Sequence, residues 1–438
     1  MRAAHARVAA AAARRLRPST RRPFPPLSRH LGLATPDHTP KGRGYQHSLT
    51  YLDGANDYWT SQTGDFCDPA LFVDLYASDA PAYGQNNSLL CSQTSQAGCA
   101  YEDDIFVNFT LGVLEAPDAD LARFKFIYDN CTAALPGWDA TRNNTCAKQV
   151  AAPDAPGAAD KGCCFRWYYS TMTNIADTHI GVVVDALKAK GMWDDTLLVV
   201  SSDNGGPIYR NGAAGANNHP HRGGKKSNFE GGVRVNAFVS GGFVPAAVRG
   251  TTTAALVGSE DWYKTFAGLA GVDAADAKAA AAGLPPVEGY DLWPLLSGAN
   301  ATGPRTEVWL GSGGAGDEDN SKAPIVQGLI RADGFKVLWG NVIENAWTGP
   351  FYPNATTSWC DTCALDCGTI DAPTCLFNVF DDPSEHLEVS AANPAIVAAM
   401  SKRLQELTKT IFAPDRGVPD VKDACRAGAD GWVRPFLP

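Results

Sequence analysis

The sequence feature that most constrains the fold is a long helical pattern that leads directly into an apolar strand. Between Trp167 and Lys190, apolar residues recur at close to 3.6-residue spacing, which predicts one helix that ends at Gly191. The segment TLLVVSS, residues 196–202, then predicts a buried strand. Because a continuous apolar strand after a helix is typical of βα alternation, we expect an open, mostly parallel α/β sheet.

Polar side chains follow this strand at the point where it ends. Asp203 and Asn204 come directly after it, and Arg222 and Lys225 follow about twenty residues later. Ligands of open α/β sheets bind outside the carboxyl ends of the strands. Carboxylate and amide oxygens suit calcium or magnesium, although calcium takes ~6–8 oxygens, and the two cations suit an anion that also touches the metal. The pattern predicts a metal and anion site, with a solvated basic loop as the alternative.

Length and pattern predict two domains behind a short head. A chain of 438 residues exceeds the ~250–300 residues at which single cores stop growing. We expect a disordered Ala/Arg-rich head at 1–26, an α/β domain at 27–304 whose region 61–164 is divergent, and a smaller domain at 305–438. The α/β domain should add a strand at Val233–Ser240 and helices at Trp262–Ala270 and Asp273–Ala282.

The last third of the chain has a different pattern. Short strand-like segments follow one another, namely TEVWLG, IVQGLIRADGFKVLWG and CLFNVFDD, and a helical segment at Pro394–Thr408 ends the series. Successive short strands joined by turn residues are typical of antiparallel pairing. We therefore predict a C-terminal α+β domain with an antiparallel sheet.

Cysteine usage and glycosylation sequons indicate a secretory or lysosomal route. The chain has 12 cysteines, and most of them cluster as Cys91 with Cys99, Cys163 with Cys164, and Cys360, Cys363 and Cys367 with Cys375. Disulfides are the favoured interpretation, and a zinc knuckle at Cys360, Cys363 and Cys367 is the alternative. Six Asn-x-Ser/Thr sequons agree with this route, at Asn86, Asn108, Asn130, Asn143, Asn300 and Asn354.

The first residues and the overall charge limit the remaining possibilities. The opening segment MRAAHARVAAAAARRLRPSTRRPFPP has only Val8–Ala13 as an apolar core, so it does not match a secretory signal peptide and its composition is closer to a transit peptide. We favour the explanation that the true start is missing. A net charge of −10 argues against nucleic-acid binding, and without a run of ~18 apolar residues we expect no membrane span.

Several motifs resemble those of one enzyme family. SDNGG at 202–206, followed by NNHPHRGGKKSNFEGGVR at 217–234, is similar to the sulfatase signature. The segments HLGLATPDHTPKGRGY, GYDLWPLLSG and CLFNVFDDPSEHLEVS match further sulfatase segments in the same order. The resemblance is of the arylsulfatase B type and runs from about His30 to Leu407, with residues 61–164 matching poorly.

The resemblance implies a fold, a reaction and a set of site residues. It implies an alkaline-phosphatase-like α/β domain with flanking helices and the smaller antiparallel domain. It also implies a sulfuric ester hydrolase that uses calcium and a formylglycine, which the formylglycine-generating enzyme makes from a Cys/Ser-x-Pro/Ala-x-Arg motif. By the same resemblance Asp203 and Asn204 would bind calcium, Lys225 and Arg222 would bind the sulfate ester, and His30 would lie near the nucleophile. Arg222, Glu230 and Arg234 match the motif and have shaping of the loop as an alternative role.

The chain departs from the family pattern where the chemistry begins. No cysteine has the Cys-x-Pro/Ala-x-Arg pattern, and Cys67–Leu71 comes closest but ends in leucine. The family's first strand, which ends in an Asp-Asp metal pair, has no match, so half of the expected calcium ligands are absent. Losing that strand should leave an open sheet edge and exposed apolar surface. We therefore expect the chain as it stands to be inactive, and we expect His179 to be structural.

Three functions remain open at this point. The favoured one is a secreted or lysosomal sulfatase acting on sulfate esters, with sulfated polysaccharide as a possible class, of which this chain is an incomplete copy. The second is a non-catalytic secreted glycoprotein that binds sulfated glycans through Lys225, Arg222 and neighbouring cations. The third is a phosphatase or phosphodiesterase of the same superfold.

Overall fold

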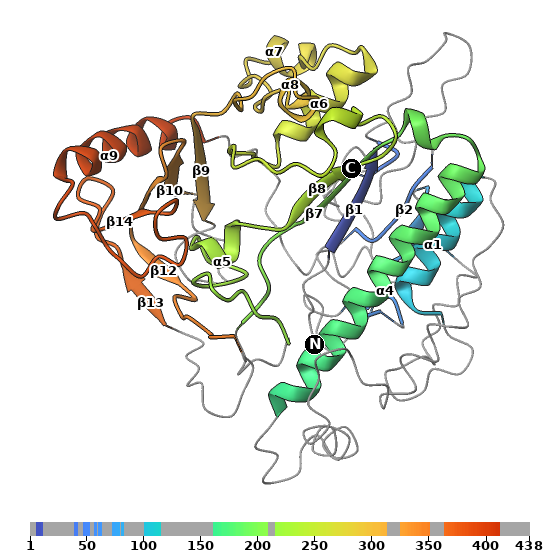
Figure 1. The fold of residues 1–438 in the computed structure, drawn as a ribbon, viewed down its shortest axis with the longest axis horizontal. Helices are drawn as coiled ribbons and strands as arrows, with labels where there is room; N and C mark the ends of the chain where they lie inside the picture. The colour runs from blue at the N-terminus through green and yellow to red at the C-terminus, as the bar shows by residue number, and fades with distance from the viewer. Residues whose placement is uncertain are drawn as a thin grey trace.

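A computed structural model describes most of the second half of the chain and selected parts of the first. The described residues are 6–11, 39–42, 47–52, 57–58, 60–63, 72–78, 80–82, 100–114, 161–208, 215–312, 325–350 and 363–411. Figure 1 shows two sheets side by side, each with helices packed against it, and the polar segment after residue 202 runs between them.

The central sheet is built around β7 (Leu197–Ser202), which lies between β1 (Ala6–Ala11) and β8 (Ala237–Ser240). The first four residues of β7 are buried. Leu197 and Val199 pack with Trp262 and Phe266 of α6 (Asp261–Ala270). Because side chains alternate along a strand, Leu198 and Val200 point to the opposite face, which confirms the predicted strand with both faces covered.

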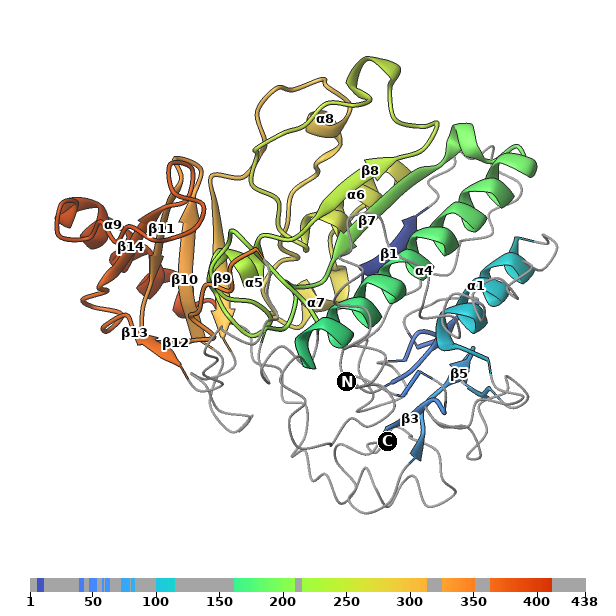
Figure 2. The same ribbon diagram turned by 60° about the horizontal axis from the view of Figure 1, so that its bottom comes forward.

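Two helices flank this sheet. α4 (Lys161–Ala189) agrees closely with the helix predicted for Trp167–Lys190, and α1 (Glu102–Val113) runs beside it in both ribbon views. Val183 and Leu187 of α4 pack against Leu114 at the end of α1. Figure 2 shows α4 next to the sheet and α1 on the far side of α4, with the short strands β3 (Gln62–Thr63) and β5 (Tyr76–Ala77) near α1.

The direction of strand pairing differs from the prediction. β7 pairs antiparallel with β8 and with β1, whereas the sequence predicts a mostly parallel sheet. A parallel neighbour requires a crossover that returns the chain to the end where the first strand began. Among the described residues between β7 and β8, the only α-helix is α5 (Glu230–Val233), and the chain re-enters the sheet at the end where β7 stops. The layered α/β arrangement stands, but the predicted parallel pairs are not found among the described strands.

The strand β1 lies inside the head for which the sequence predicts disorder. Its backbone pairs with β7 from Ala6 opposite Ser202 to Ala11 opposite Leu197. The exposed edge of a strand offers a row of unpaired N–H and C=O groups to any extended segment. The prediction of disorder is therefore wrong for these six residues, because an alanine-rich backbone can pair with an open edge without any side-chain pattern.

The described short strands between residues 49 and 82 form two small sheets near α1. One contains β2 (Leu49–Thr50), β5 (Tyr76–Ala77) and β6 (Ala80–Pro81), and the other pairs β3 (Gln62–Thr63) with β4 (Phe72–Val73). Their buried side chains meet α1 in one cluster of Leu49, Tyr51, Leu75, Ala82, Ile105 and Phe106. Asp74 is buried and accepts a hydrogen bond from the backbone of Leu52 at 2.8 Å.

The predicted C-terminal antiparallel sheet is confirmed. Its strand order is β14-β11-β10-β9, with β9 (Glu307–Ser312), β10 (Ile325–Arg331), β11 (Phe335–Leu338) and β14 (Cys375–Asn378). The helix α9 (Pro394–Thr408) covers one face through Met400 and Leu404. A two-stranded sheet of β12 (Asn341–Ile343) and β13 (Ala364–Asp366) lies beside it. The short helices α7 (Ala277–Ala281) and α8 (Trp293–Leu296) precede the sheet.

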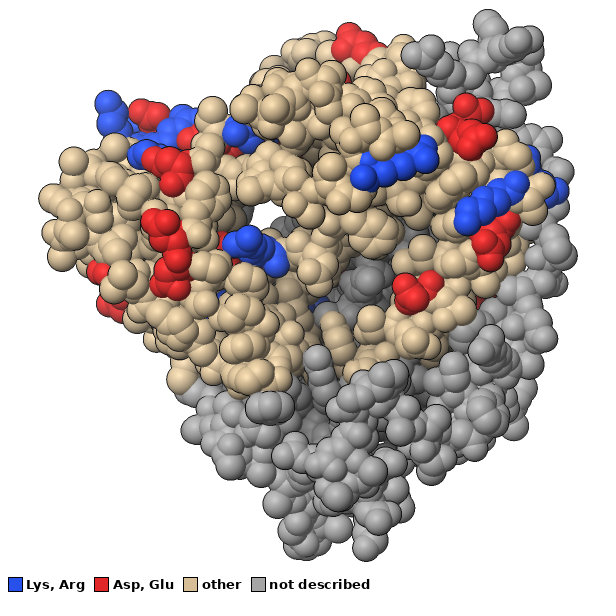
Figure 3. Space-filling model, in the orientation of Figure 1, with Lys and Arg blue, Asp and Glu red and all other residues tan. Residues whose placement is uncertain are grey.

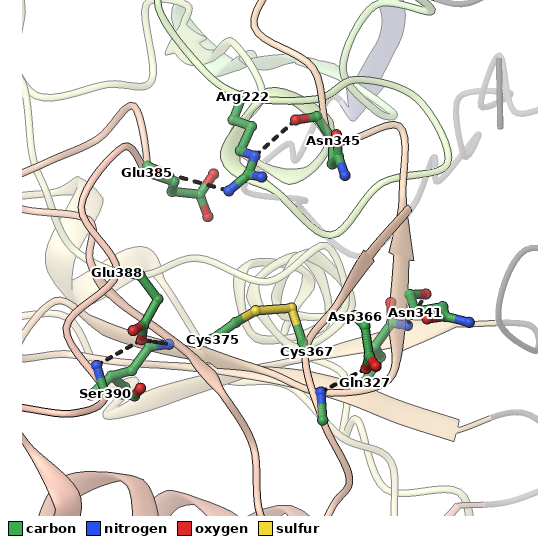
Figure 4. Close-up of a disulfide and its surroundings, with 12 residues drawn as sticks. Arg222, Gln327, Asn341, Asn345, Asp366, Cys367, Cys375, Glu385, Glu388 and Ser390 are labelled. Atoms are coloured by element: carbon green, nitrogen blue, oxygen red, sulfur yellow. Dashed lines mark hydrogen bonds between the residues drawn. A yellow bond between two sulfur atoms is a disulfide. The ribbon is translucent and has the colours of Figure 1, made fainter. Parts of the chain in front are cut away.

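A disulfide pins the C-terminal sheet. Cys367 and Cys375 are bonded, as Figure 4 shows, and Cys363 also belongs to a disulfide. Oxidised cysteines do not supply thiolates to zinc, so the zinc-knuckle alternative is wrong for this cluster. The other predicted cysteine pairs lie outside the residues whose side chains the structure describes.

Within the described ranges, no helix combines the length and apolar character needed to cross a membrane.

Candidate functional site

Asp203 and Asn204 lie at the carboxyl end of β7, as predicted. Asp203 is exposed and Asn204 is half-buried. The Asn204 amide nitrogen donates to the Gly205 carbonyl at 2.9 Å, and the Ser202 hydroxyl donates to the Asn204 carbonyl at 2.7 Å. The amide nitrogen is thus used within the loop, which makes the side-chain oxygen of Asn204 the group that is offered to a ligand.

Both residues line a large groove between the two sheets. Its volume is about 2050 Å³, and Lys226 and Arg234 also line it. Figure 3 shows the hollow between the two halves of the molecule. The walls include four exposed large apolar side chains, namely Phe238, Val257, Trp309 and Phe380.

Three glycine pairs form one compact unit behind the Asp203–Asn204 pair. We call Gly205, Gly206, Gly223, Gly224, Gly231 and Gly232 the glycine cluster. The Gly205 N–H donates to the Gly232 carbonyl at 2.8 Å, and the Gly231 N–H donates to the Arg222 carbonyl at 2.7 Å. A Cβ on Gly205 would lie 1.6 Å from the Gly231 oxygen, and one on Gly231 would lie 2.3 Å from the Gly223 oxygen. Only glycine permits this approach, so the SDNGG, RGGK and EGGVR motifs are parts of one structure.

An amide side chain that the sequence analysis did not single out ties the cluster together. The Asn218 side-chain oxygen accepts from the Gly206 N–H at 2.9 Å, and its nitrogen donates to the carbonyls of Gly206 at 2.8 Å and Gly223 at 3.0 Å. The Lys225 N–H donates to the same Gly206 carbonyl at 3.2 Å. The structure therefore brings Lys225, which is half-buried, next to the loop that follows Asp203 and Asn204.

Arg222 has a different environment from the one expected of a substrate-binding cation. Its guanidinium is buried and stacks on the rings of Phe229 and Trp347, with its central carbon 4.1 Å from each ring centre. Its Nε donates to the Asn345 carbonyl at 2.9 Å, as Figure 4 shows. Desolvation lowers the pKa of Arg222 to about 10, against the opposing effect of the Glu385 charge. These contacts correspond to the loop-shaping role that the sequence left open.

The same loop inserts into the core of the C-terminal sheet. Phe229 is fully buried there, and its ring meets that of Phe377 edge-on at 6.2 Å. The Asn228 side chain donates to the Gln327 side-chain oxygen at 2.7 Å. The residues between the RGGK and EGGVR motifs therefore belong to the C-terminal sheet in packing, although they lie far from it in sequence.

A buried ion cluster of Glu230, Lys336 and Glu385 completes this junction. The Lys336 Nζ lies 3.0 Å from Glu230 Oε1 and 2.8 Å from Glu385 Oε1. The other Glu385 oxygen accepts from the Glu230 N–H at 2.6 Å. Burial alone would lower the pKa of Lys336, but the two carboxylates raise it above the ordinary value. Desolvation raises the pKa of Glu385, and the charge of Lys336 opposes that effect.

Comparison with known proteins identifies the family. Residues 29–272, more than half of the chain, match the family model described as Sulfatase. This chain belongs to the sulfatase family. Arylsulfatase J of Mus musculus is 27% identical over 408 residues, which cover 87% of this chain and 59% of the relative. Arylsulfatase A of Homo sapiens is 28% identical over 243 residues, 54% of this chain and 42% of the relative. The chain thus spans about three fifths of the mouse relative.

Solved structures confirm the fold class of this sulfatase. The crystal structure of Ps i-CgsB superposes with a TM-score of 0.53 at 20% identity and covers 90% of this chain and 73% of that one. A second structure of Ps i-CgsB, in complex with k-i-k-neocarrahexaose, gives a TM-score of 0.50 at 19% identity, with the same coverage of 90% and 73%. At these identities the likeness shows the fold alone.

The described part of this sulfatase supplies only a fraction of a calcium site. Asp203 and Asn204 offer oxygen donors, yet no group of three or more His, Cys, Asp or Glu side chains suited to a metal occurs among the described residues. Calcium takes ~6–8 oxygens, so these residues do not by themselves fit the ion.

The two histidines singled out in the sequence lie apart from this loop. His30 falls outside the described residues. His179 is buried in α4, with its Nε2 3.1 Å from an Asp104 carboxylate oxygen on α1. It therefore joins two helices, which is the structural role that the sequence predicts.

Proposed function

We propose that this chain is the sulfate-ester-binding part of a sulfuric ester hydrolase, and that as it stands it binds substrate without hydrolysing it. The observation that carries the proposal is the glycine cluster, which joins the Asp203–Asn204 loop to the backbone of Lys225 at Gly206. Family membership gives this arrangement a reaction class, the hydrolysis of sulfate esters, and the chain spans 59% of the mouse relative.

The residues present can bind and orient a sulfate ester. A sulfate group carries a negative charge on its outer oxygens, and a lysine ammonium offers three donors that suit such an oxygen. Lys225 is our candidate for this contact, and Lys226 and Arg234 on the groove wall add positive potential. Hydrolysis also needs a nucleophile, and no cysteine of the chain lies in the formylglycine motif. The formylglycine-generating enzyme is accordingly a partner only of a sulfatase chain that carries this motif.

The groove supports a substrate larger than a simple aryl sulfate. Its volume of about 2050 Å³ exceeds the ~300–1,000 Å³ of typical small-molecule pockets. Ps i-CgsB, a similar structure, was crystallised with k-i-k-neocarrahexaose, an oligosaccharide. We therefore include sulfated polysaccharide among the proposed ligands. Asp203 and Asn204 would be two of the calcium ligands only in a site that has further oxygen donors.

Titration with an aryl sulfate tests the proposal, with binding and hydrolysis measured separately. We expect the purified chain to bind the ester without releasing sulfate. We expect Lys225→Ala to weaken binding about 10- to 100-fold, since a charge-assisted hydrogen bond is worth roughly 1.5–3 kcal/mol. The matched control is Lys402→Ala, an exposed lysine of α9. Sulfate release would overturn the proposed inactivity. Absence of binding, or hydrolysis of a phosphate ester instead, would overturn the sulfate site.

We also propose a secreted or lysosomal location. The disulfide bonds of Cys363, Cys367 and Cys375 support an oxidising compartment. The sequon at Asn300 supports glycosylation, because its side chain is exposed and accepts hydrogen bonds from Thr302 at 3.1 Å from both the N–H and the hydroxyl. A glycan on Asn300, detected by the mass change on enzymatic deglycosylation, would support this location.

A further inference from the structure

We infer that Lys336 is a positioning residue, which acts from the C-terminal sheet through Glu230 and Glu385 to fix the loop that carries Asp203 and Asn204. The contacts are independent of the proposed function, and only the consequence for ligand binding rests on it. No motif of the sequence analysis includes Lys336 or assigns it a role.

In the buried ion cluster, Lys336 lies between the carboxylates of Glu230 and Glu385, and we call this arrangement the clamp. A single ammonium bridges two carboxylates at 3.0 and 2.8 Å, and the side chains of Lys336, Glu230 and Glu385 are almost fully buried. Glu385 also accepts from the Glu230 N–H, which is the first N–H of α5. The clamp thus holds both the side chain and the backbone of the residue that begins the EGGVR turn.

Close backbone contacts link the position of Glu230 to that of the Asp203–Asn204 loop. The two residues after Glu230 are Gly231 and Gly232, which are bonded to the Arg222 carbonyl and the Gly205 N–H. A Cβ on Gly232 would lie 2.1 Å from the Ser227 oxygen, and one on Gly205 would lie 1.6 Å from the Gly231 oxygen. Backbones in such close contact cannot slide past one another, so a shift of Glu230 moves Gly205 and the neighbouring Asn204.

Charged residues of both the RGGK and the EGGVR motif interact with this cluster. Two carboxylates face Lys336, and the charge of Arg222 also acts on Glu385. Arg222 Nη1 lies 3.5 Å from the Glu385 carbonyl oxygen, and Arg222 directly precedes Gly223 of the glycine cluster. The C-terminal sheet therefore holds the RGGK turn through Arg222 and the EGGVR turn through Lys336.

Two features argue for positioning rather than general stabilisation. Well-packed apolar residues often stabilise a protein as much as a buried ion pair does, so three buried charges are an inefficient way to gain stability alone. Glu385 also has a φ of +56°. This left-handed conformation is unfavourable for residues other than glycine, asparagine and aspartate. The chain keeps this conformation where Glu385 contacts Lys336 and Glu230.

Amide hydrogen exchange on the full chain tests the inference. We expect Lys336→Met to speed exchange in the peptides covering residues 203–208 and 228–235 at least about tenfold, while α4 and α9 keep their protection. Lys402→Met, on the exposed face of α9, is the matched control and should change neither peptide. Equal exchange in Lys336→Met and the unsubstituted chain would overturn the inference.

A charge-free variant guards against misfolding of the single substitution. Lys336→Met with Glu230→Gln and Glu385→Gln removes all three charges of the cluster together, so that no carboxylate is left facing a missing lysine, and it should recover most of the melting temperature, yet the two loop peptides should stay unprotected. If this triple variant regains the protection of the unsubstituted chain, the clamp is only structural and the inference fails. Aryl-sulfate affinity is measured alongside. An unsubstituted chain that binds no ester refutes the proposed function, while the exchange comparison still decides the role of Lys336.

Discussion

The C-terminal sheet and the central sheet differ in how completely they are covered. In the C-terminal sheet, Leu329 and Val337 are fully buried beneath α9. In the central sheet, the strand β8 leaves Phe238 53% exposed along the groove. The loop that joins SDNGG to EGGVR lies between them and inserts Phe229 into the C-terminal core. The difference teaches that the candidate site takes its rigidity from the C-terminal sheet, although its ligand residues follow a strand of the central sheet.

The largest expected effect comes from truncating a buried residue of the closed sheet. Leu329→Ala should destabilise the protein by about 2–5 kcal/mol, because the removed side chain leaves a cavity. Phe238→Ala, on the open sheet, should cost less than about 1 kcal/mol, because half of that side chain is already in water. Urea unfolding of both variants measures the difference. Equal losses would mean that β8 is covered and that the comparison is wrong.

Glycine-to-alanine substitutions should have opposite effects in the Asp203–Asn204 loop and in the helix α4. Gly205→Ala should destabilise by about 1–3 kcal/mol, because its Cβ would overlap the Gly231 oxygen. Gly181→Ala lies in α4 with open space around the added methyl group and should stabilise by about 0.5–1 kcal/mol. Thermal unfolding gives both values. A tolerated alanine at position 205 would show that the glycine cluster is looser than its contacts indicate.

The free energy of unfolding at alkaline pH tests whether Lys336 is charged in the folded protein. The folded-state pKa of Lys336 is raised above the ordinary value, so its contribution is fully present below the unfolded pKa and is lost as pH rises through the folded one. The free energy of unfolding should therefore fall more steeply above pH ~10.4 in the unsubstituted chain than in Lys336→Met. Chemical denaturation across the alkaline range measures both slopes, and parallel slopes would contradict a charged Lys336.

Two sequons should differ in glycosylation with little effect on stability. Asn300 is exposed, and its substitution by glutamine should remove one glycan from protein made in a secretory cell. Asn108 lies within α1, and Thr110 of the same sequon is buried with its hydroxyl bonded to the Phe106 carbonyl at 2.9 Å. We expect no glycan on Asn108, so Asn108→Gln should not lower the intact mass by the mass of a glycan. A glycan on Asn108 would show that α1 is accessible before it packs.

Local pattern was sufficient for the elements with strong periodicity. The helix α4, the strand β7 and the helix α9 follow from apolar spacing alone, because burial of one face or both dictates their sequence. The direction of β8 did not follow, since it depends on how the glycine-rich loop folds back. β1 did not follow either, because pairing through the backbone leaves no side-chain signal in an alanine run.

The candidate site was predictable only in part. Asp203, Asn204 and Lys225 were found because motif residues and strand ends can be identified in the sequence. The role of Lys336 was missed, and Glu385 was found only as part of a matching segment, because these residues lie 106 and 155 residues from Glu230 and each contacts it across the junction. A lysine within the apolar strand FKVL was the one available signal, since a buried charge requires a partner.

The buried ion cluster has a consequence for how this protein can change. The two sheets are not interchangeable modules, because a C-terminal sheet taken from another chain would bring its own residue at position 336 and leave Glu230 facing the wrong charge. Glu230, Lys336 and Glu385 should therefore vary together across related sequences or not at all. For the same reason, a fragment that ends at the predicted boundary near residue 304 would separate Glu230 from both of its partners. In engineering terms, the useful unit is the SDNGG-to-EGGVR loop together with its C-terminal sheet.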